Sequence, residues 1–262
     1  MAPLFQQPFM SGGFPSMNRA GVGGFNSLYG DTGLKAYWKF NAASGNIPNE
    51  SIDASAIANS ELVPNGATHG ATGLIGDALS FDGTNDDAQA DNSNLSDWDF
   101  LHTSGGSFSA VAWVYADNWT GNGAILSCFN ADTAQNGFFL SVDSDGTVRV
   151  DISNNLSLVA EVSKNTSGTV GTGGWHMIST TFDDSANVLT VRIDNNTRET
   201  FSSLTSLNAT GTTTAKFMVG ALTVGAWWHD GLIDEVSLWG SRLLSTTEEE
   251  SLYNSGAGLE IY

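Results

Sequence analysis

The chain has 262 residues, of which 40% are hydrophobic and 14% are charged, and this size and composition suit one sizeable hydrophobic core. Its 28 acidic and 9 basic residues give a net charge of −19, so a phosphate backbone would be repelled. This balance argues against nucleic acid as a partner. It is compatible with a solvated acidic surface, a bound hard cation or a basic partner surface.

Residues 1–30 differ in composition from the rest of the chain. They contain six Gly, three Pro and four Phe, no acidic residue, and Arg19 as their only charged side chain. Gly and Pro disfavour regular elements, whereas so many aromatic side chains are unusual in a solvated linker. The segment is interpreted either as a disordered tail or as an extended arm that docks on a neighbouring subunit. In the second interpretation the docking side chains are Phe5, Phe9, Phe14, Phe25 and Tyr29.

The first residues lack the basic region and the uninterrupted apolar stretch of a secretory signal. No later segment offers the roughly 18 consecutive apolar residues that cross a bilayer. We therefore expect the protein to be made in the cytoplasm and to have no membrane partner.

Short alternating runs begin at Leu34, where Leu34, Ala36 and Trp38 share one face of a predicted strand. Turn residues such as Asp82-Gly83 separate the runs. Strands are predicted at 34–40, 78–81, 108–115, 124–129, 138–142, 147–152, 156–162, 175–182, 188–193, 217–220 and 232–239. This pattern predicts an all-β fold, a two-sheet antiparallel jelly-roll sandwich over residues 31–262. The single cysteine, Cys128, lies in an apolar run and is predicted to be a buried, reduced thiol.

One short C-terminal helix is predicted after the last strand. Ser245 and Glu248 have the spacing of a capping box, and the helix is expected to end near Asn254. The dipole of a helix favours anions in its first turn, so the Glu residues there are interpreted as cap residues and not as catalytic groups.

Five motifs in order resemble the laminin-G-like domains of the concanavalin A-like lectin and glucanase superfamily, in their bacterial and viral form. The resemblance covers about residues 33–258, and its motifs lie at 33–40, 76–83, 108–114, 174–178 and 231–236. It implies the jelly-roll sandwich but says little about function, because this fold hosts many roles. One departure is Asp87-Ala88-Gln89-Ala90, where members usually have an aromatic and β-branched strand, so this strand is expected to be weak or displaced.

Glucanases of the superfamily carry Glu-x-Asp-x-Glu on one strand, which places the catalytic carboxylates on one face. The sequence has no such pattern, and Asp234 and Glu235, as neighbours in a strand, are expected to point to opposite faces. Other catalytic motifs, such as a Gly-x-Ser-x-Gly elbow, are also absent from the sequence. The protein is therefore predicted not to be an enzyme.

A structural calcium joining the first and last strands is implied by the resemblance. Asn41 and Asp234 resemble its ligands, although the family often has an acid where this chain has Asn41. In the last strand Asp234 has the parity of Val236 and Leu238, which predicts an inward carboxylate. The alternative is an Asp234 carboxylate that accepts hydrogen bonds from backbone amides.

Trp227, Trp228 and His229 form a predicted loop before that strand. Adjacent tryptophans in a loop are suited to stacking on a sugar ring or on a partner surface, although one of the two is expected to belong to the core. Trp119, in the turn after Tyr115, is a further candidate for stacking.

Two functions compete. The first is a virion structural protein of a tailed phage, a capsid decoration protein or a tail or fibre component. It would be attached to capsid proteins or sister subunits through the arm, homo-oligomeric, and located on the virion after assembly in the host cytoplasm. The alternative is a surface or secreted lectin-like module that binds glycans outside the cell. A diverged glycosidase, a third reading, is opposed by the missing carboxylates.

Overall fold

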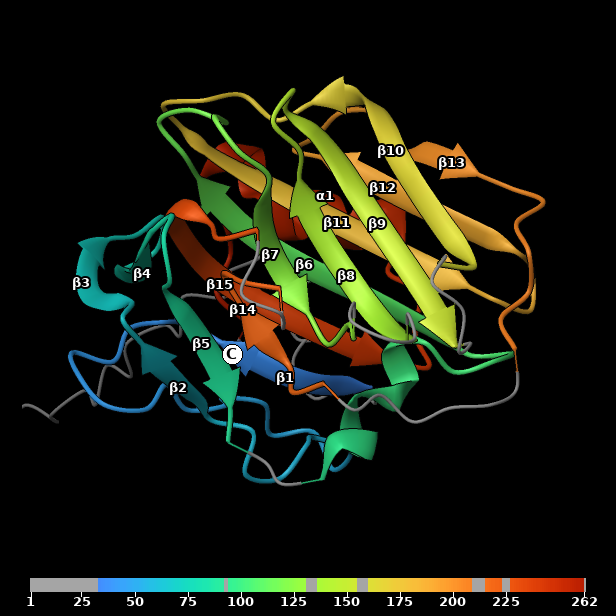
Figure 1. Ribbon diagram of the computed structural model, residues 1–262, viewed down its shortest axis with the longest axis horizontal. Coiled ribbons are helices and arrows are strands. Elements are labelled where there is room, and N and C mark those ends of the chain that lie inside the picture. Colours follow the sequence, from blue (N-terminus) through green and yellow to red (C-terminus); the bar gives the residue numbers. More distant parts are fainter. Residues whose placement is uncertain are drawn as a thin grey trace, which may run out of the picture.

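The computed structural model of the protein describes residues 33–91, 94–130, 136–154, 160–208, 215–222 and 227–261. The predicted arm and its five aromatic side chains therefore lie outside the described residues. Within the described ranges the strands form two antiparallel sheets packed as a sandwich, as Figure 1 shows, which confirms the predicted fold class.

The larger sheet centres on its longest strand, the C-terminal β15. The strands β1 and β4 pair with successive parts of β15 along one edge, and β6 pairs with its other edge. In the described residues the order is β13-β12-β11-β6-β15-β4-β3, with β1 beside β15. The strands are β1 (Leu34–Trp38), β3 (Thr68–Thr72), β4 (Asp77–Asp82), β6 (Ser107–Tyr115), β11 (Trp175–Asp183), β12 (Val188–Ile193), β13 (Glu199–Phe201) and β15 (Asp230–Gly240).

The second sheet has the order β10-β9-β8-β7-β14-β5-β2 in the described residues. Its strands are β2 (Leu62–Asn65), β5 (Asp87–Ala90), β7 (Gly123–Ser127), β8 (Asn136–Val142), β9 (Thr147–Asn154), β10 (Val162–Thr169) and β14 (Met218–Val219).

Two strands of this second sheet differ from the sequence prediction. β10 begins where the predicted strand 156–162 ends, because its mostly polar, exposed edge-strand sequence lacks the apolar alternation on which the prediction relied. The strand β5 was expected to be weak or displaced, yet it pairs with both β2 and β14 and buries Ala88 and Ala90.

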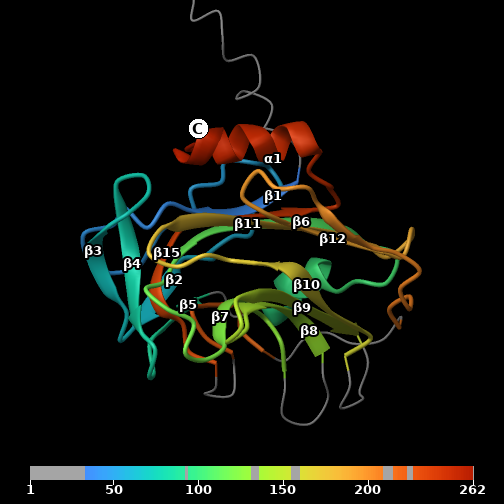
Figure 2. The same ribbon diagram turned by 90° about the horizontal axis from the view of Figure 1, so that it is seen from above.

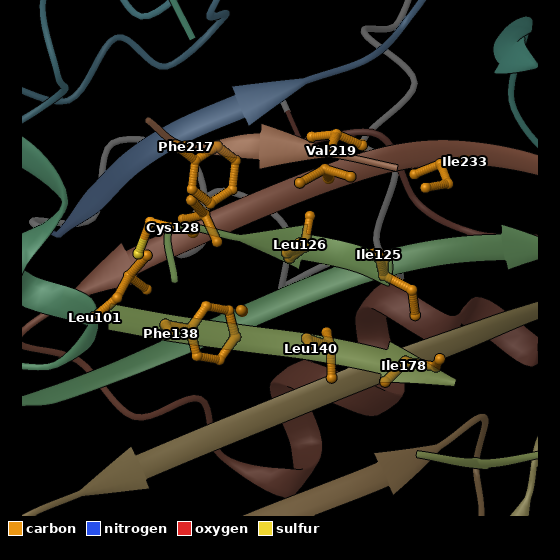
Figure 3. Close-up of a cluster of buried hydrophobic side chains, with 14 of the residues drawn as sticks. Leu101, Ile125, Leu126, Cys128, Phe138, Leu140, Ile178, Phe217, Val219 and Ile233 are labelled. Atoms are coloured by element: carbon orange, nitrogen blue, oxygen red, sulfur yellow. The ribbon is translucent and has the colours of Figure 1, made fainter. Parts of the chain in front are cut away.

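The core between the sheets is aromatic at one end. The 3-10 helix η2 (Leu95–Leu101) contributes Trp98, whose ring stacks on Phe217 with centroids 4.5 Å apart, and Trp38 stacks on the same phenyl ring at 5.4 Å. Figure 3 shows Phe217 and Cys128 among the aliphatic side chains of this core. Cys128 is fully buried, as predicted.

The helix α1 (Thr246–Tyr253) and the short η3 (Asn254–Gly256) lie on the outer face of the larger sheet, as Figure 2 shows. The predicted capping box is present, since Glu248 N donates to Ser245 Oγ at 3.3 Å and Ser245 N donates to Glu248 Oε2 at 2.7 Å. No helix in the described ranges is long and apolar enough to cross a membrane.

Two contacts fix α1 on the sheet. Tyr253 stacks on Trp113 of β6 with ring centroids 5.7 Å apart. The fully buried Glu249 accepts hydrogen bonds from Arg198 Nε at 2.8 Å and from Arg192 Nη1 at 3.3 Å. The helix thus covers a second apolar cluster, on the side of the sheet away from the core.

A β-bulge divides β15. Between Asp234 and Ser237 this strand advances three residues while β6 advances two, and Glu235 has a positive φ of 48°. As a result Ile233 and Val236 both face the core, whereas Asp234 pairs with Trp113 of the outer cluster. The predicted inward parity of Asp234 is therefore wrong, because strict alternation does not hold across the extra residue.

Candidate ligand-binding groove

The ends of β4 and β6 and the beginning of β15 meet at one end of the sandwich, where two hollows lie side by side. The first is lined by Gly83, Asn118, Trp119, Thr120, Gly121, Gly123, Trp228 and Asp230. The second is lined by Ser80, Phe81, Tyr115, Asp117, Asn118, Asp230, Gly231 and Leu232. Because Asn118 and Asp230 line both hollows, the two hollows are adjacent, and we call them together the groove.

Hydrogen bonds to the backbone fix the indole ring of Trp119 in the wall of the groove. Its indole Nε1 donates to the carbonyl oxygens of Val170 and Gly171, each at 3.2 Å. The polar edge of the half-buried indole is therefore satisfied within the protein. The remaining exposed part of the ring is fixed in orientation and available for stacking.

His229 lies beneath the groove and does not line it. Its side chain is fully buried, and its ring meets the ring of Phe81 edge-on at 5.9 Å. Burial lowers the pKa of His229 to about 4, so the imidazole is neutral at physiological pH. The residue also connects the sheets, because its N–H donates to Gly220 O at 2.8 Å and its carbonyl accepts from Gly83 N at 3.0 Å.

The neighbouring tryptophans 227 and 228 have different surroundings. Trp227 packs edge-on against Phe139 at 5.4 Å, and the guanidinium of Arg149 lies 5.3 Å from its ring. Phe139 belongs to a small apolar cluster against which Trp227 packs. Trp228 instead lines the groove with Trp119. Of the three predicted ligand-binding residues, the structure therefore places only Trp228 in the groove.

The polar lining of the groove is acidic. Asp230 and Asp117 are exposed, and Asp117 Oδ1 accepts a hydrogen bond from the Tyr115 hydroxyl at 2.9 Å. None of the described residues that line the two hollows is Lys or Arg. Sequence reasoning had singled out Trp119, but it missed Asn118 and Asp230 as partners, since strands that are distant in the chain bring them together.

The side chains of the two predicted calcium ligands, Asp234 and Asn41, both accept hydrogen bonds from the backbone of the same turn. The Asp234 carboxylate accepts from the backbone N–H of Leu74 at 2.9 Å and of Ile75 at 3.1 Å through Oδ2, and Glu235 N donates to its Oδ1 at 2.8 Å. Asn41 Oδ1 accepts from Asp77 N at 2.7 Å. The two side chains therefore both act on the turn between β3 and β4, as hydrogen-bond acceptors.

This arrangement does not fit a calcium site. A cation requires free oxygen ligands, whereas both Asp234 oxygens already face N–H donors whose hydrogens carry partial positive charge. In the described part of the chain no three His, Cys, Asp or Glu side chains gather as metal ligands would. The calcium stays a prediction, and these contacts match the alternative of an Asp satisfied by backbone amides.

Glu235 lies on the same outer side of the sheet as Asp234, and not on the opposite face as predicted. Its carboxylate accepts a hydrogen bond from the buried hydroxyl of Tyr37, a member of the outer apolar cluster. Burial raises the pKa of Glu235 to about 8 and the pKa of Asp234 to about 7. Neither carboxylate lines the groove.

Several solved structures share this fold. A Trypanosoma rangeli sialidase is 16% identical with a TM-score of 0.62; the match covers 87% of this chain and 34% of the sialidase, so the chain spans about a third of its length. Domain 4 of AbnA, an arabinanase from Geobacillus stearothermophilus, is 17% identical with a TM-score of 0.57, covering 84% of this chain and 97% of the domain. The botulinum neurotoxin serotype G binding domain is 13% identical with a TM-score of 0.53, covering 85% and 51% of the two chains.

The sequence comparisons agree with the fold. A search of curated proteins found no match. The family model described as concanavalin A-like lectin/glucanases superfamily matches residues 82–248, which is well over half of the chain. With the sandwich described above, this match shows that the chain belongs to the concanavalin A-like lectin/glucanases superfamily.

Proposed function

We propose that the sandwich is a non-catalytic carbohydrate-binding domain that holds its ligand in the groove. The observation that carries the proposal is the meeting of Trp119 and Trp228, from separate loops, in one hollow with Asn118 and Asp230. Aromatic faces bind the apolar C–H face of a sugar ring, and amide and carboxylate groups pair with its hydroxyls. A few polar groups among aromatic walls are typical of small-ligand sites.

Structures of similar fold support this proposal at the level of ligand class. The Geobacillus domain was solved with arabinotriose and the Trypanosoma sialidase with sialic acid. Both ligands are sugars, although identities of 14–17% are too low to transfer any residue of those sites to this chain.

The arrangement of carboxylates supports the absence of catalysis. Glycoside hydrolysis needs two carboxyl groups that flank one bond, one of them kept protonated at neutral pH. Asp234 and Glu235 have raised pKa values, but they bind backbone amides and Tyr37 and line neither hollow of the groove. The acids that could titrate as a pair therefore support the fold and have no access to a ligand in the groove.

The test is a glycan array followed by calorimetric titration, with arabinotriose included as a soluble probe. We expect Trp228→Ala to weaken binding about fivefold or more, since stacking of a ligand ring on one aromatic side chain, as known for nucleic-acid bases, contributes on the order of 1–3 kcal/mol. The matched control is Trp227→Phe, which changes the neighbouring tryptophan outside the groove and keeps an aromatic ring on Phe139. Equal loss in both variants, or no glycan bound by the wild-type protein, would refute the proposal.

We infer a second role for the N-terminal segment, attachment of this domain to a virion surface or to sister subunits. The supporting observation is compositional: four Phe and one Tyr occur among Gly and Pro with no acidic residue in residues 1–30. Each aromatic side chain buried on a partner contributes about 1.5–3 kcal/mol, whereas fixing one residue costs about 1–2 kcal/mol, so these side chains offset the ordering of only part of the segment, around the anchors. Such an arm and a glycan-binding sandwich are compatible in one tail, fibre or decoration protein.

The full-length triple variant Phe5, Phe9 and Phe14→Ser tests this role. We expect it to fold like the wild type by circular dichroism but to sediment as a smaller species and to lose binding to phage capsids or tails. A variant that assembles as the wild type does would leave the segment without this role.

A further inference from the structure

The geometry points to a neutral oligosaccharide of at least two consecutive sugar units as the ligand of the groove, and to exclusion of anionic glycans. This inference rests on the proposed function and adds the ligand class. It depends on two features of the groove that the carbohydrate proposal did not use, the sign of its charge and its division into two adjacent hollows.

The charge of the groove selects against anions. Asp117 and Asp230 are exposed in the lining, and among the described lining residues no Lys or Arg offsets them. Outside the described ranges the only basic residue of the chain is Arg19. Of the eight basic residues within those ranges, five already pair with carboxylates elsewhere, namely Lys39, Arg149, Arg192, Arg198 and Arg242.

A sialic acid or uronic acid carboxylate bound here would therefore face two carboxylates, with no Lys or Arg among the described lining residues. At contact distances near a protein surface, one such repulsion is large enough to weaken binding by about tenfold or more. Sugar hydroxyls meet no such penalty, because a carboxylate accepts their hydrogen bonds and the Asn118 amide both donates and accepts. The lining thus favours neutral sugars.

The length of the ligand follows from the shape. The first hollow has Trp119 and Trp228 in its wall, and the second has Tyr115, whose ring is fixed by the hydroxyl bond to Asp117. Asn118 and Asp230 line both hollows at their junction. Each hollow has its own aromatic side chain in its wall. An oligosaccharide that crosses the junction therefore stacks on aromatic rings in both hollows, while a single sugar stacks in only one.

The test uses the full-length protein on an array of matched pairs, each a neutral glycan and its sialylated or uronate-bearing counterpart. We expect the neutral member to bind at least tenfold more tightly at low salt, and the difference to shrink as salt screens the repulsion. Titration with arabinose, arabinobiose and arabinotriose is expected to show a rise in affinity of at least tenfold from one unit to two.

Two variants distinguish the effect of the two carboxylate charges in the groove from the effect of surface charge elsewhere. Asp117→Asn with Asp230→Asn preserves size and hydrogen-bonding capacity but removes both charges, and we expect it to bind both members of each pair within about threefold. The control Asp91→Asn removes an exposed charge outside the groove and is expected to keep the wild-type preference. Anionic glycans bound as tightly as neutral ones, with Trp228→Ala still reducing both, would overturn this inference and leave the carbohydrate proposal standing. Binding that does not depend on Trp228 would overturn both.

Discussion

Tyr37 and Glu235 lie 198 residues apart in the sequence, and the Tyr37 hydroxyl donates a buried hydrogen bond to the Glu235 carboxylate. The same hydroxyl accepts from Ile261 N at 3.1 Å, so one phenol connects the first strand, the last strand and the C-terminal residues. Asp234 lies beside this pair, and its charge adds to the effect of burial in raising the pKa of Glu235.

We expect the protein to lose stability as the pH rises from about 4 to about 8. The folded-state pKa values, about 7 for Asp234 and about 8 for Glu235, lie above their ordinary values of 3.8 and 4.5. The folded state therefore holds protons that the unfolded state releases. This contribution is complete below pH 4 and is lost as the pH rises through the folded-state values, at about 1.4 kcal/mol for each pH unit and group.

Glu235→Gln tests this assignment by urea denaturation at pH 4.5, 6 and 8. The amide oxygen still accepts from Tyr37, so the variant should be more stable than the wild type at pH 8 and should have a flatter pH profile. The exposed control Glu50→Gln should follow the wild-type profile. A wild-type profile that rises between pH 6 and 8 would contradict the prediction.

We expect Glu249→Ala to destabilise the protein by about 3–5 kcal/mol, because it leaves the buried Arg192 and the neighbouring Arg198 without their shared carboxylate. The measurement is the free energy of unfolding in urea. Glu250→Ala is the matched control, since its side chain is 49% exposed although it also pairs with Arg192. An exposed pair of this kind contributes about 1 kcal/mol or less. Similar losses in both variants would show that the buried network has no special weight.

The Cys128 thiol should be unreactive in the native protein. Complete burial raises its pKa to about 12, so almost no thiolate forms, and no reagent reaches the sulfur without opening of the core. Ellman's reagent is expected to modify one thiol per chain in guanidinium chloride and none over hours in buffer. Rapid native modification would show that the aromatic end of the core opens locally.

Asp234→Ala should lower the melting temperature by several degrees, because three backbone N–H groups lose their acceptor, and the buried one, that of Glu235, costs about 1–3 kcal/mol when it is left unsatisfied. From these bonds we expect a chelator to leave the wild-type melting temperature unchanged. A chelator-dependent drop that disappears in Asp234→Ala would instead establish the calcium site implied by the family resemblance.

Local sequence signals predicted much of the fold. Ser245 and Glu248 identified the start of α1, because a capping box depends on four adjacent residues, and the alternation at Leu34 and Ala36 identified β1. Polar edge strands such as β10 have no comparable signal. The face of Asp234 was predicted wrongly because a bulge depends on pairing with a distant strand.

The candidate site was less accessible to sequence reasoning. Trp228 and Trp119 were identified as aromatic residues in loops, but their meeting depends on the register between β6 and β15. The neighbouring Trp227, which has a positive φ of 64°, packs on Phe139 instead. Adjacent residues in a loop have no fixed periodicity, so the sequence alone does not tell which of them faces a ligand.

The bulge in β15 also determines how this protein tolerates changes in chain length. Deleting Glu235 would remove the extra residue and restore strict alternation, with Ile233, Val236 and Leu238 still facing the core. The loss would fall on the outer side of the sheet, where the Tyr37 hydroxyl would lose its carboxylate partner. A deletion of Leu238 would instead bring Trp239 from the outer cluster to the core face. The strand is therefore expected to tolerate the loss of one residue at the bulge better than the loss of one residue beyond it.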